Sequence, residues 1–167
     1  MPKASPLPQR RSIRLRSWNY SWPGWYFVTI TTRLGWWYFG VNDERGLRPS
    51  EPGHMVSATW AEMPGRFPRL QVDAWVVMPN HFHGILHLLG GAFEARRTVG
   101  AIISAFKSIT TVRYVHGIRA CGWPPFHRRL WHRNFHDRIL RTPAALAATR
   151  RYIELNPQLH LQRARRP

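Results

Sequence analysis

The stretch VVMPNHFHGILHL, residues 76–88, restricts the fold of this chain more than any other segment. Runs of apolar and β-branched residues, typical of buried strands, stand on both sides of Pro79-Asn80. Proline and asparagine suit the two central positions of a tight turn. The stretch therefore predicts an antiparallel hairpin, with strands at residues 72–78 and 82–89.

Two histidines stand one residue apart where the second predicted strand begins. Because side chains alternate along a strand, His81 and His83 share one face and Phe82 enters the core on the other. Imidazole nitrogens at these positions can converge on one metal ion. The alternative is a pair of hydrogen-bonded histidines on a half-exposed strand, and the spacing alone leaves both open. His87 has the same parity and is either a further polar residue of that face or a neighbour of the site.

Hydrophobic periodicity and turn residues predict the other elements. Strands are expected at residues 25–32 and 135–141, helices at 54–63 and 98–114, a small hairpin around 42–44, and a last helix from 142 to Pro157. Thr98 and Thr142 can cap the helices that they precede, and Pro157 is expected to end the last one. The order β-α-β-β-α-β-α predicts an α+β fold, a ferredoxin-like split βαβ sandwich with a central antiparallel sheet and an added C-terminal helix.

A length of 167 residues fits a single domain. We expect this domain at residues 18–160, between a flexible basic arm at 1–17 and a basic tail at 161–167. The arm lacks the apolar segment of a secretory signal, and no run of about 18 apolar residues could span a membrane. Cys121 has no second cysteine to pair with. The expected compartment is therefore the cytoplasm.

Charge is the strongest compositional feature, because 25 Lys and Arg residues oppose eight Asp and Glu residues, for a net charge of +17. GC-rich coding explains arginine over lysine but not a surplus of this size, since such a surface repels itself and is relieved by a polyanion. The charge favours nucleic acid as the partner. An anionic membrane surface is the other interpretation, but it requires a basic amphipathic helix that the sequence does not clearly contain.

The residue patterns that several other kinds of catalytic or metal site require are missing from the sequence. No GxxxxGK[ST] motif is present, so a nucleoside triphosphate is not an expected cofactor. The eight acidic residues are scattered, whereas a two-metal nuclease needs several that converge. Cys121 has no evident base beside it, and the histidines at 116, 127, 132 and 136 lack zinc-finger spacing.

The last predicted helix places Tyr152 and Asn156 four residues apart, and therefore on one face. A phenolic oxygen is a possible nucleophile, an amide oxygen is a possible metal ligand, and Arg150 and Arg151 could meet a phosphate. A tyrosine packed in the core and an asparagine that closes the helix before Pro157 explain the same residues without chemistry. On spacing alone this second explanation is the stronger one.

Together these residues resemble the REP-associated tyrosine transposases, a family within the HUH single-strand endonuclease superfamily. The resemblance covers nearly the whole chain, and it is most specific where MPNHFHGI and RRYIELNP occur in this order and with this separation. The matching segments are residues 10–15, 25–32, 76–85, 99–103, 106–108, 130–135 and 151–157.

The resemblance implies a site and a reaction. His81, His83 and Asn156 would hold one divalent ion on the open face of the sheet, Mg²⁺ or Mn²⁺, although a histidine-rich site also accepts Zn²⁺ or Ni²⁺. Tyr152 would attack single-stranded, hairpin-forming repetitive DNA, leaving a 5′-phosphotyrosine and a free 3′-hydroxyl. The covalent intermediate keeps the phosphodiester energy, so rejoining needs no nucleoside triphosphate. The protein would be a nucleoid-associated DNA transposase of a bacterial-type cell.

The resemblance also bears on DNA contacts and on alternative functions. DNA would be held by the basic residues Arg10, Arg11, Arg14, Arg16, Lys107, Arg150 and Arg151. The tyrosine that some members carry after the segment at residues 131–134 is absent, which removes a rival to Tyr152. A monomer is favoured over a homodimer. The alternatives are a non-catalytic DNA- or RNA-binding protein of the same fold, and a degenerate transposase that binds without cutting.

Overall fold

The computed structural model describes residues 19–90 and 97–164. A four-stranded sheet in the order β4-β5-β1-β6 forms its centre, and every pair of neighbouring strands is antiparallel. The strands are β1 (Gly24–Thr31), β4 (Leu70–Met78), β5 (His81–Leu88) and β6 (His136–Leu140). Because β5 lies between β1 and β4, these two strands run parallel, as in a split βαβ sandwich. The predicted fold class is confirmed.

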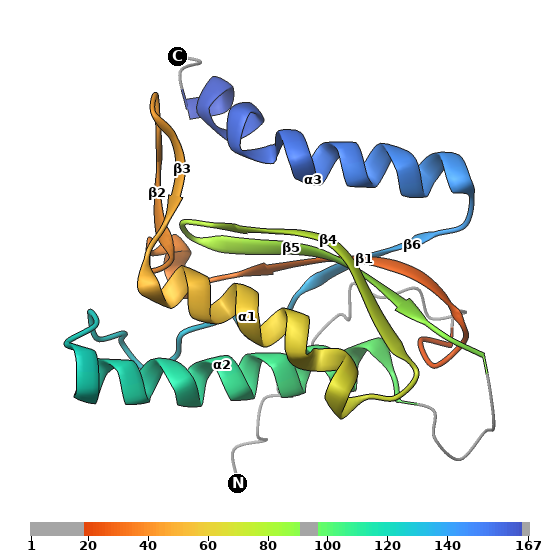
Figure 1. Ribbon diagram of the computed structural model, residues 1–167, viewed down its shortest axis with the longest axis horizontal. Helices are drawn as coiled ribbons and strands as arrows, with labels where there is room; N and C mark the ends of the chain where they lie inside the picture. Colours follow the sequence, from red (N-terminus) through yellow and green to blue (C-terminus); the bar gives the residue numbers. More distant parts are fainter. Residues whose placement is uncertain (1–18, 91–96, 165–167) are drawn as a thin grey trace, which may run out of the picture.

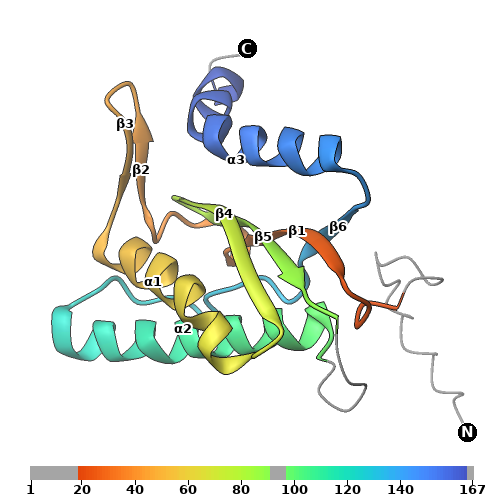
Figure 2. The same ribbon diagram turned by 45° about the vertical axis from the view of Figure 1, so that its right-hand side comes forward.

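Helices cover both faces of this sheet (Figure 1 and Figure 2). α1 (Glu51–Arg66) and α2 (Val99–Cys121) lie on one face, and α3 (Pro143–Ala164) lies on the other. A second sheet of β2 (Gly40–Asp43) and β3 (Gly46–Pro49) projects beside the end of α3, as the small hairpin predicted around residues 42–44. A short 3₁₀ helix, η1 (Arg33–Gly35), lies between β1 and this hairpin.

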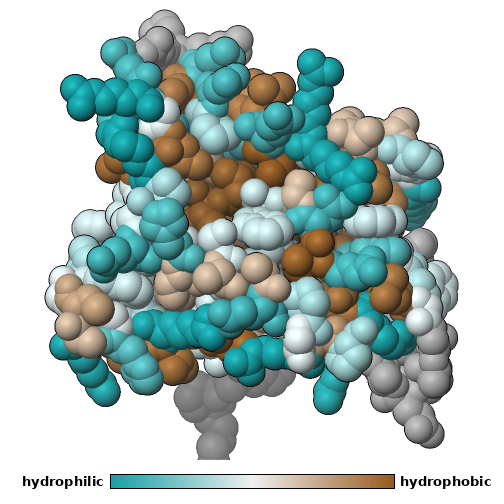
Figure 3. All heavy atoms as spheres, in the orientation of Figure 1, coloured by the Kyte–Doolittle hydropathy of each residue, from teal (hydrophilic) through white to brown (hydrophobic). Residues whose placement is uncertain are grey.

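Alternation along the strands separates two cores. In β1 and β5 the even-numbered side chains face α1 and α2, where Phe82 packs against Trp60. The odd-numbered side chains face α3, where Ile85, Leu140 and Ile153 form a smaller core. Figure 3 shows apolar side chains gathered beneath α3 on one face of the molecule. The histidine pair therefore stands on a face that α3 covers, not on the open face that we expected.

The predicted turn and the predicted starts of α2 and α3 are confirmed, whereas α1 begins at Glu51, before the predicted residue 54. Met78 pairs with His81 across the β4–β5 hairpin, which leaves a two-residue turn at Pro79-Asn80. Thr98 and Thr142 each accept, through Oγ1, a hydrogen bond from the amide three residues further on, both at 3.1 Å. Side-chain oxygens thus cap α2 and α3 as the sequence indicates.

Both later helices are longer than predicted. α2 continues beyond residue 114 to Cys121, and Gly122 then takes the left-handed conformation (φ 69°) that favours glycine. α3 continues through Pro157 to Ala164, so the prediction that this proline ends the helix was wrong. Residues 161–164 therefore belong to α3 and not to a separate tail.

A hydrogen bond from β2 reaches α3 at its proline. Pro157 has no amide hydrogen, so it removes one helical hydrogen bond and disfavours helical geometry in the residue before it. Asn42 is buried, and its Nδ2 atom donates to the Pro157 carbonyl oxygen at 2.9 Å. The hairpin thus supports the helix beyond the proline.

In the described part of the chain, no helix is both long enough and apolar enough to cross a membrane. Cys121 is a free, exposed cysteine at the end of α2.

Gly84 permits a close contact in the main core. A Cβ atom at this position would lie 2.7 Å from the Phe82 ring and 3.0 Å from the Trp60 ring. Glycine weakens a strand interior, but here the missing side chain leaves room for these two rings, whose centroids are 4.8 Å apart.

We expect Gly84→Ala to lower the free energy of unfolding by about 1–3 kcal/mol, because the added methyl group must displace aromatic rings in a packed core. Gly65→Ala is the matched control, since Gly65 lies in α1 with open space where its Cβ would be. Alanine is the better helix former, so the control should be neutral or stabilising. Urea unfolding measures both variants, and wild-type stability of Gly84→Ala would contradict this description of the core.

Candidate active site

The histidine pair lies at the beginning of β5, directly beside β1. In the strand register, His81 is opposite Thr31 and His83 is opposite Thr29. The imidazole centroids of the two histidines are 4.7 Å apart, and their planes meet at 76°. The rings are therefore close enough for one nitrogen of each to bind the same ion.

Each imidazole is held through its Nδ1 atom. Asn80 Oδ1 lies 2.7 Å from His81 Nδ1. Because an amide oxygen only accepts, His81 Nδ1 carries the hydrogen and Nε2 keeps a lone pair. Thr29 Oγ1 lies 2.8 Å from His83 Nδ1 and can accept in the same way. Such partners orient metal-binding histidines and select the tautomer that leaves Nε2 available.

Burial keeps both imidazoles neutral. His83 is only 5 % exposed, and desolvation, with a smaller contribution from the charge of His81, lowers the pKa of His83 to about 3. Desolvation lowers the pKa of His81 to about 4, with charge repulsion from His160 in the same direction and the nearby Asn156 amide opposing it. Both rings are therefore unprotonated at neutral pH, which is the form that binds metals.

α3 brings Tyr152 and Asn156 to the histidines. The Tyr152 ring lies 5.5 Å from the His83 ring, centroid to centroid. The rings of Tyr152 and Phe27 meet edge to face at 6.0 Å and 89°, so Phe27 restricts how the tyrosine can turn. Asn156 lies one helical turn further along and contacts His81. The structure thus brings together the four residues predicted for catalysis and metal binding, whose roles stay predictions.

Asn156 Oδ1 is buried and has no hydrogen-bond partner within the described residues. A buried oxygen without a partner costs on the order of 1–3 kcal/mol, so this atom favours a ligand that those residues do not supply. Two neutral imidazoles and one amide oxygen form a donor set that suits a divalent ion.

Within residues 19–90 and 97–164, no group of three His, Cys, Asp or Glu side chains is arranged to hold a metal. The expected ligand set does not require such a group, because its third member is the amide of Asn156.

His160 also lies in this site and was not predicted. Its ring is 6.0 Å from the His81 ring and 6.3 Å from the Trp37 ring. His160 Nδ1 is buried without a hydrogen-bond partner in the described part of the molecule. His160 follows Asn156 by four residues and so shares its helix face, which is the signal that could have identified it. Because α3 was expected to end at Pro157, residue 160 was not placed on this helix.

The two arginines before the tyrosine differ in their contacts. Arg150 forms an ion pair with Asp73, and its guanidinium lies 5.7 Å from the Trp25 ring centroid. Hydrogen bonding to Arg150 is the main cause of the lowered pKa of Asp73. Asp73 lies in the irregular part of β4, so this ion pair joins α3 to the edge of the sheet. Arg151 is exposed, and phosphate contacts of either arginine stay predictions.

Lys107 supports the segment that leads into β6. Its Nζ atom donates to the carbonyl oxygens of His132, Arg133 and Asn134 at 2.9, 3.3 and 2.9 Å. An ammonium group has three hydrogens, so these contacts use its whole donor capacity. The other predicted DNA contacts, in the N-terminal arm, lie outside the described residues: Arg10, Arg11, Arg14 and Arg16.

His87 lies further along β5, away from the pair. Its ring stacks on Trp25 with centroids 4.1 Å apart, and its Nδ1 atom is 3.3 Å from Gln71 Oε1. His87 is therefore a further polar residue of the α3 face and not a member of the site.

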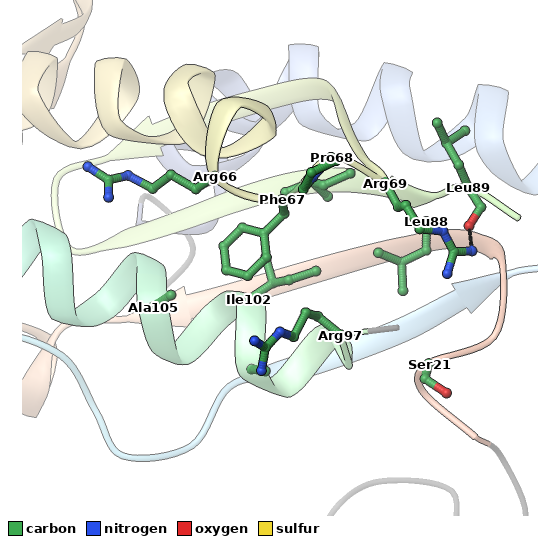
Figure 4. Close-up of a pocket in the computed structure, with 12 residues that line it drawn as sticks. Ser21, Arg66, Phe67, Pro68, Arg69, Leu88, Leu89, Arg97, Ile102 and Ala105 are labelled. Atoms are coloured by element: carbon green, nitrogen blue, oxygen red, sulfur yellow. Dashed lines mark hydrogen bonds between the residues drawn. The ribbon is translucent and has the colours of Figure 1, made fainter. Parts of the chain in front are cut away.

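A hollow of about 540 Å³ lies at the opposite end of β5, away from the histidines (Figure 4). Its lining combines the guanidinium groups of Arg66, Arg69 and Arg97 with apolar side chains such as Phe67. Arg69 donates to the Leu89 carbonyl oxygen and so supports the end of the strand. No predicted site residue among those described lines this hollow, so the candidate site does not coincide with it.

Comparisons with known proteins identify one sequence relative and solved structures that share this fold. No family model matches the chain. An uncharacterized protein of Haemophilus influenzae is 28 % identical over 173 residues, which cover 92 % of this chain and 91 % of that protein.

Two solved structures share the fold. A REP-associated tyrosine transposase bound to a REP hairpin matches with a TM-score of 0.60 and 21 % identity, over 90 % of this chain and 74 % of that one. A candidate transposase from Deinococcus radiodurans R1 matches with a TM-score of 0.51 and 16 % identity, over 84 % of this chain and 95 % of that one. The predicted resemblance to REP-associated tyrosine transposases is confirmed at the level of the fold.

We expect the metal-free protein to lose stability as the pH falls below about 6.5, the reference pKa of unfolded histidine. Burial holds the folded values at about 4 for His81 and about 3 for His83. Between these values and pH 6.5 the unfolded state binds protons that the folded state does not, so the free energy of unfolding decreases. The total loss is on the order of several kcal/mol, since one pKa unit is about 1.4 kcal/mol.

Urea unfolding between about pH 7 and pH 5, with a chelator present, measures this loss. The double variant His81→Gln/His83→Gln is the comparison, because its side chains do not titrate and its stability should vary less with pH. If the double variant showed the same pH dependence as the wild type, the titrating groups would lie elsewhere.

Proposed function

We propose that this protein is a metal-dependent endonuclease and strand transferase of single-stranded DNA, with Tyr152 as the nucleophile. The observation that carries the proposal is the convergence of Tyr152 and Asn156, both from α3, on a pair of buried, neutral imidazoles. A purely structural role would leave Asn156 Oδ1 buried without a partner, which native proteins rarely tolerate.

In the proposed reaction, Tyr152 Oη attacks the phosphorus of a DNA phosphodiester. The bond from phosphorus to the 3′ oxygen breaks, the tyrosine proton passes to solvent, and the leaving 3′ oxygen takes up a proton. The products are a 5′-phosphotyrosine and a free 3′-hydroxyl. Attack of a 3′-hydroxyl on the phosphotyrosine reverses these bond changes, so strands are rejoined without a nucleoside triphosphate.

The other residues hold and orient the reacting groups. His81, His83 and Asn156 would hold one divalent ion, Mg²⁺ or Mn²⁺, which when bound supplies a Lewis acid for the non-bridging phosphate oxygens. The Nδ1 contacts described above keep both imidazoles turned for this role. Phe27 lies against both the Tyr152 ring and the His83 ring, at 6.0 and 5.3 Å, and so keeps the phenol beside the histidines.

Charge and the shared fold support DNA as the substrate. A net charge of +17 favours a polyanion, and the related transposase was solved with a REP hairpin. We infer that hairpin-forming, repetitive single-stranded DNA is the substrate of this chain as well. The corresponding function is DNA transposition and recombination by a nucleoid-associated monomer, whose basic N-terminal arm contacts phosphates.

We expect Tyr152→Phe to abolish the covalent DNA adduct and to leave the fold and the DNA affinity nearly intact, because the change deletes one oxygen atom. A labelled hairpin oligonucleotide with single-stranded flanks is incubated with protein and Mn²⁺ and separated on a denaturing gel. The adduct appears as a shifted band that resists detergent. Tyr38→Phe deletes the same atom outside the site and should form the adduct as the wild type does.

An adduct that survives in Tyr152→Phe would refute the assignment of the nucleophile. DNA binding by the wild type without any adduct would instead support the alternative function, a non-catalytic or degenerate DNA- or RNA-binding protein of this fold.

A further inference from the structure

We propose that single-stranded DNA reaches the tyrosine along a basic groove between η1 and the loop that precedes β6, and that Lys107 positions this loop instead of binding phosphate. The inference rests on the proposed function and extends it. The groove has a volume of about 580 Å³, and we name it the arginine groove after four lining residues, Arg33, Arg128, Arg129 and Arg133.

The arginine groove lies next to the histidine pair. His132, which also lines it, donates its backbone amide to the Thr31 carbonyl oxygen at 2.9 Å. Thr31 lies in β1, and on the opposite edge of β1 its register partner in β5 is His81. The loop is therefore separated from the first histidine by one strand, or about 10 Å at the usual strand spacing. The groove therefore borders the strand that pairs with the first histidine.

The charge of the groove selects its ligand. Among the described residues that line it are four arginines and no acidic residue. Three ion pairs join described residues: Asp43 with Arg48, Glu62 with Arg113, and Asp73 with Arg150. None of them involves the four arginines of the groove. Guanidinium groups bind phosphate oxygens in a bidentate manner, so a phosphodiester backbone both relieves their repulsion and fits their geometry.

The loop is built to hold this shape without DNA. Trp131 donates its indole hydrogen to Thr110 Oγ1 at 2.8 Å in a buried contact, and Lys107 holds the three carbonyl oxygens that follow. Arg128 takes a positive φ of 61°, which is unfavourable for a residue with a side chain and is tolerated only where surrounding contacts enforce it. The arginines are thus displayed by a constrained backbone.

Exposed aromatic side chains adjoin the groove. Trp36 is 61 % exposed and Trp37 is 54 % exposed. Trp36 shares a small hollow with Arg33 and Arg129, while the Trp37 ring lies 6.3 Å from His160, beside the candidate site. Tryptophans beside a basic track are the usual means by which proteins stack the bases of single-stranded nucleic acid without reading their sequence.

Salt dependence of binding distinguishes groove contacts from the general charge. In a Tyr152→Phe background without metal, fluorescence anisotropy measures the affinity for a single-stranded oligonucleotide at several salt concentrations. The triple variant Arg33→Ala/Arg129→Ala/Arg133→Ala should weaken binding on the order of tenfold or more, and should reduce the slope of log affinity against log salt by about 2. The control Arg45→Ala/Arg66→Ala/Arg119→Ala removes the same charge from exposed positions elsewhere. Equal changes of affinity and salt slope in both triple variants would contradict the proposal that DNA binds in the arginine groove.

Lys107 has a test of its own. Lys107→Met should weaken DNA binding and speed amide hydrogen exchange in residues 130–135, because the carbonyl oxygens lose their donor, while Lys107→Arg should restore part of both. If Lys107→Met lowered the salt slope by about 0.7 and left hydrogen exchange unchanged, Lys107 would contact a phosphate directly and its positioning role would be wrong.

The experiments can reject the groove proposal and the proposed function independently of each other. Adduct formation by the wild type with equal slopes in the two triple variants would reject the groove alone. Unequal slopes without any adduct in the wild type would retain the groove as a DNA-binding surface and reject the catalytic proposal.

Discussion

The burial of two neutral imidazoles between the sheet and α3 is the constraint on which the rest of the site depends. Polar atoms in such a layer need partners, because an unmade hydrogen bond costs more there than in water. Asn80 and Thr29 satisfy one nitrogen of each ring. The other nitrogens face a layer to which α3 contributes Tyr152 and Asn156, and the Asn156 amide oxygen in it has no partner among the described residues. In the proposed function, a divalent ion would satisfy these remaining atoms together.

The same constraint gives the β2–β3 hairpin a role. α3 must remain helical past Pro157 if it is to cover the histidines with Tyr152 near one end and His160 near the other. The hairpin reaches this point through the hydrogen bond from Asn42. A small element inserted between β1 and α1 therefore contacts the helix at its proline, within the part that lies against the site.

Local patterns in the sequence were sufficient for much of this arrangement. Alternation along β5, the Pro79-Asn80 turn and the two threonine caps depend on neighbours in the chain, and each was predictable. The order of elements predicted the sheet, but the histidines were expected on an open face, and α3 covers that face.

Contacts between distant residues were not predictable in this way. The donor that supports Pro157 stands 115 residues earlier in the chain, and the carboxylate that pairs with Arg150 stands 77 residues earlier. The sequence shows the charges of Arg150 and Lys107 but not the carboxylate and carbonyl oxygens that their side chains contact in the fold. His160 was missed for the same reason, since its position depends on the helix that Asn42 supports.

Calorimetric titration of the metal-free protein with Mn²⁺ tests most directly whether the buried histidine pair is a metal site. The account predicts one site in the wild type, its loss in His81→Ala, and its retention in His87→Ala, which changes the same residue type on the same strand and face. Thr29→Val should weaken the site by about 10- to 100-fold, because it removes the partner that orients His83. Unchanged Mn²⁺ binding in His81→Ala, or an equal loss in His87→Ala, would contradict the account.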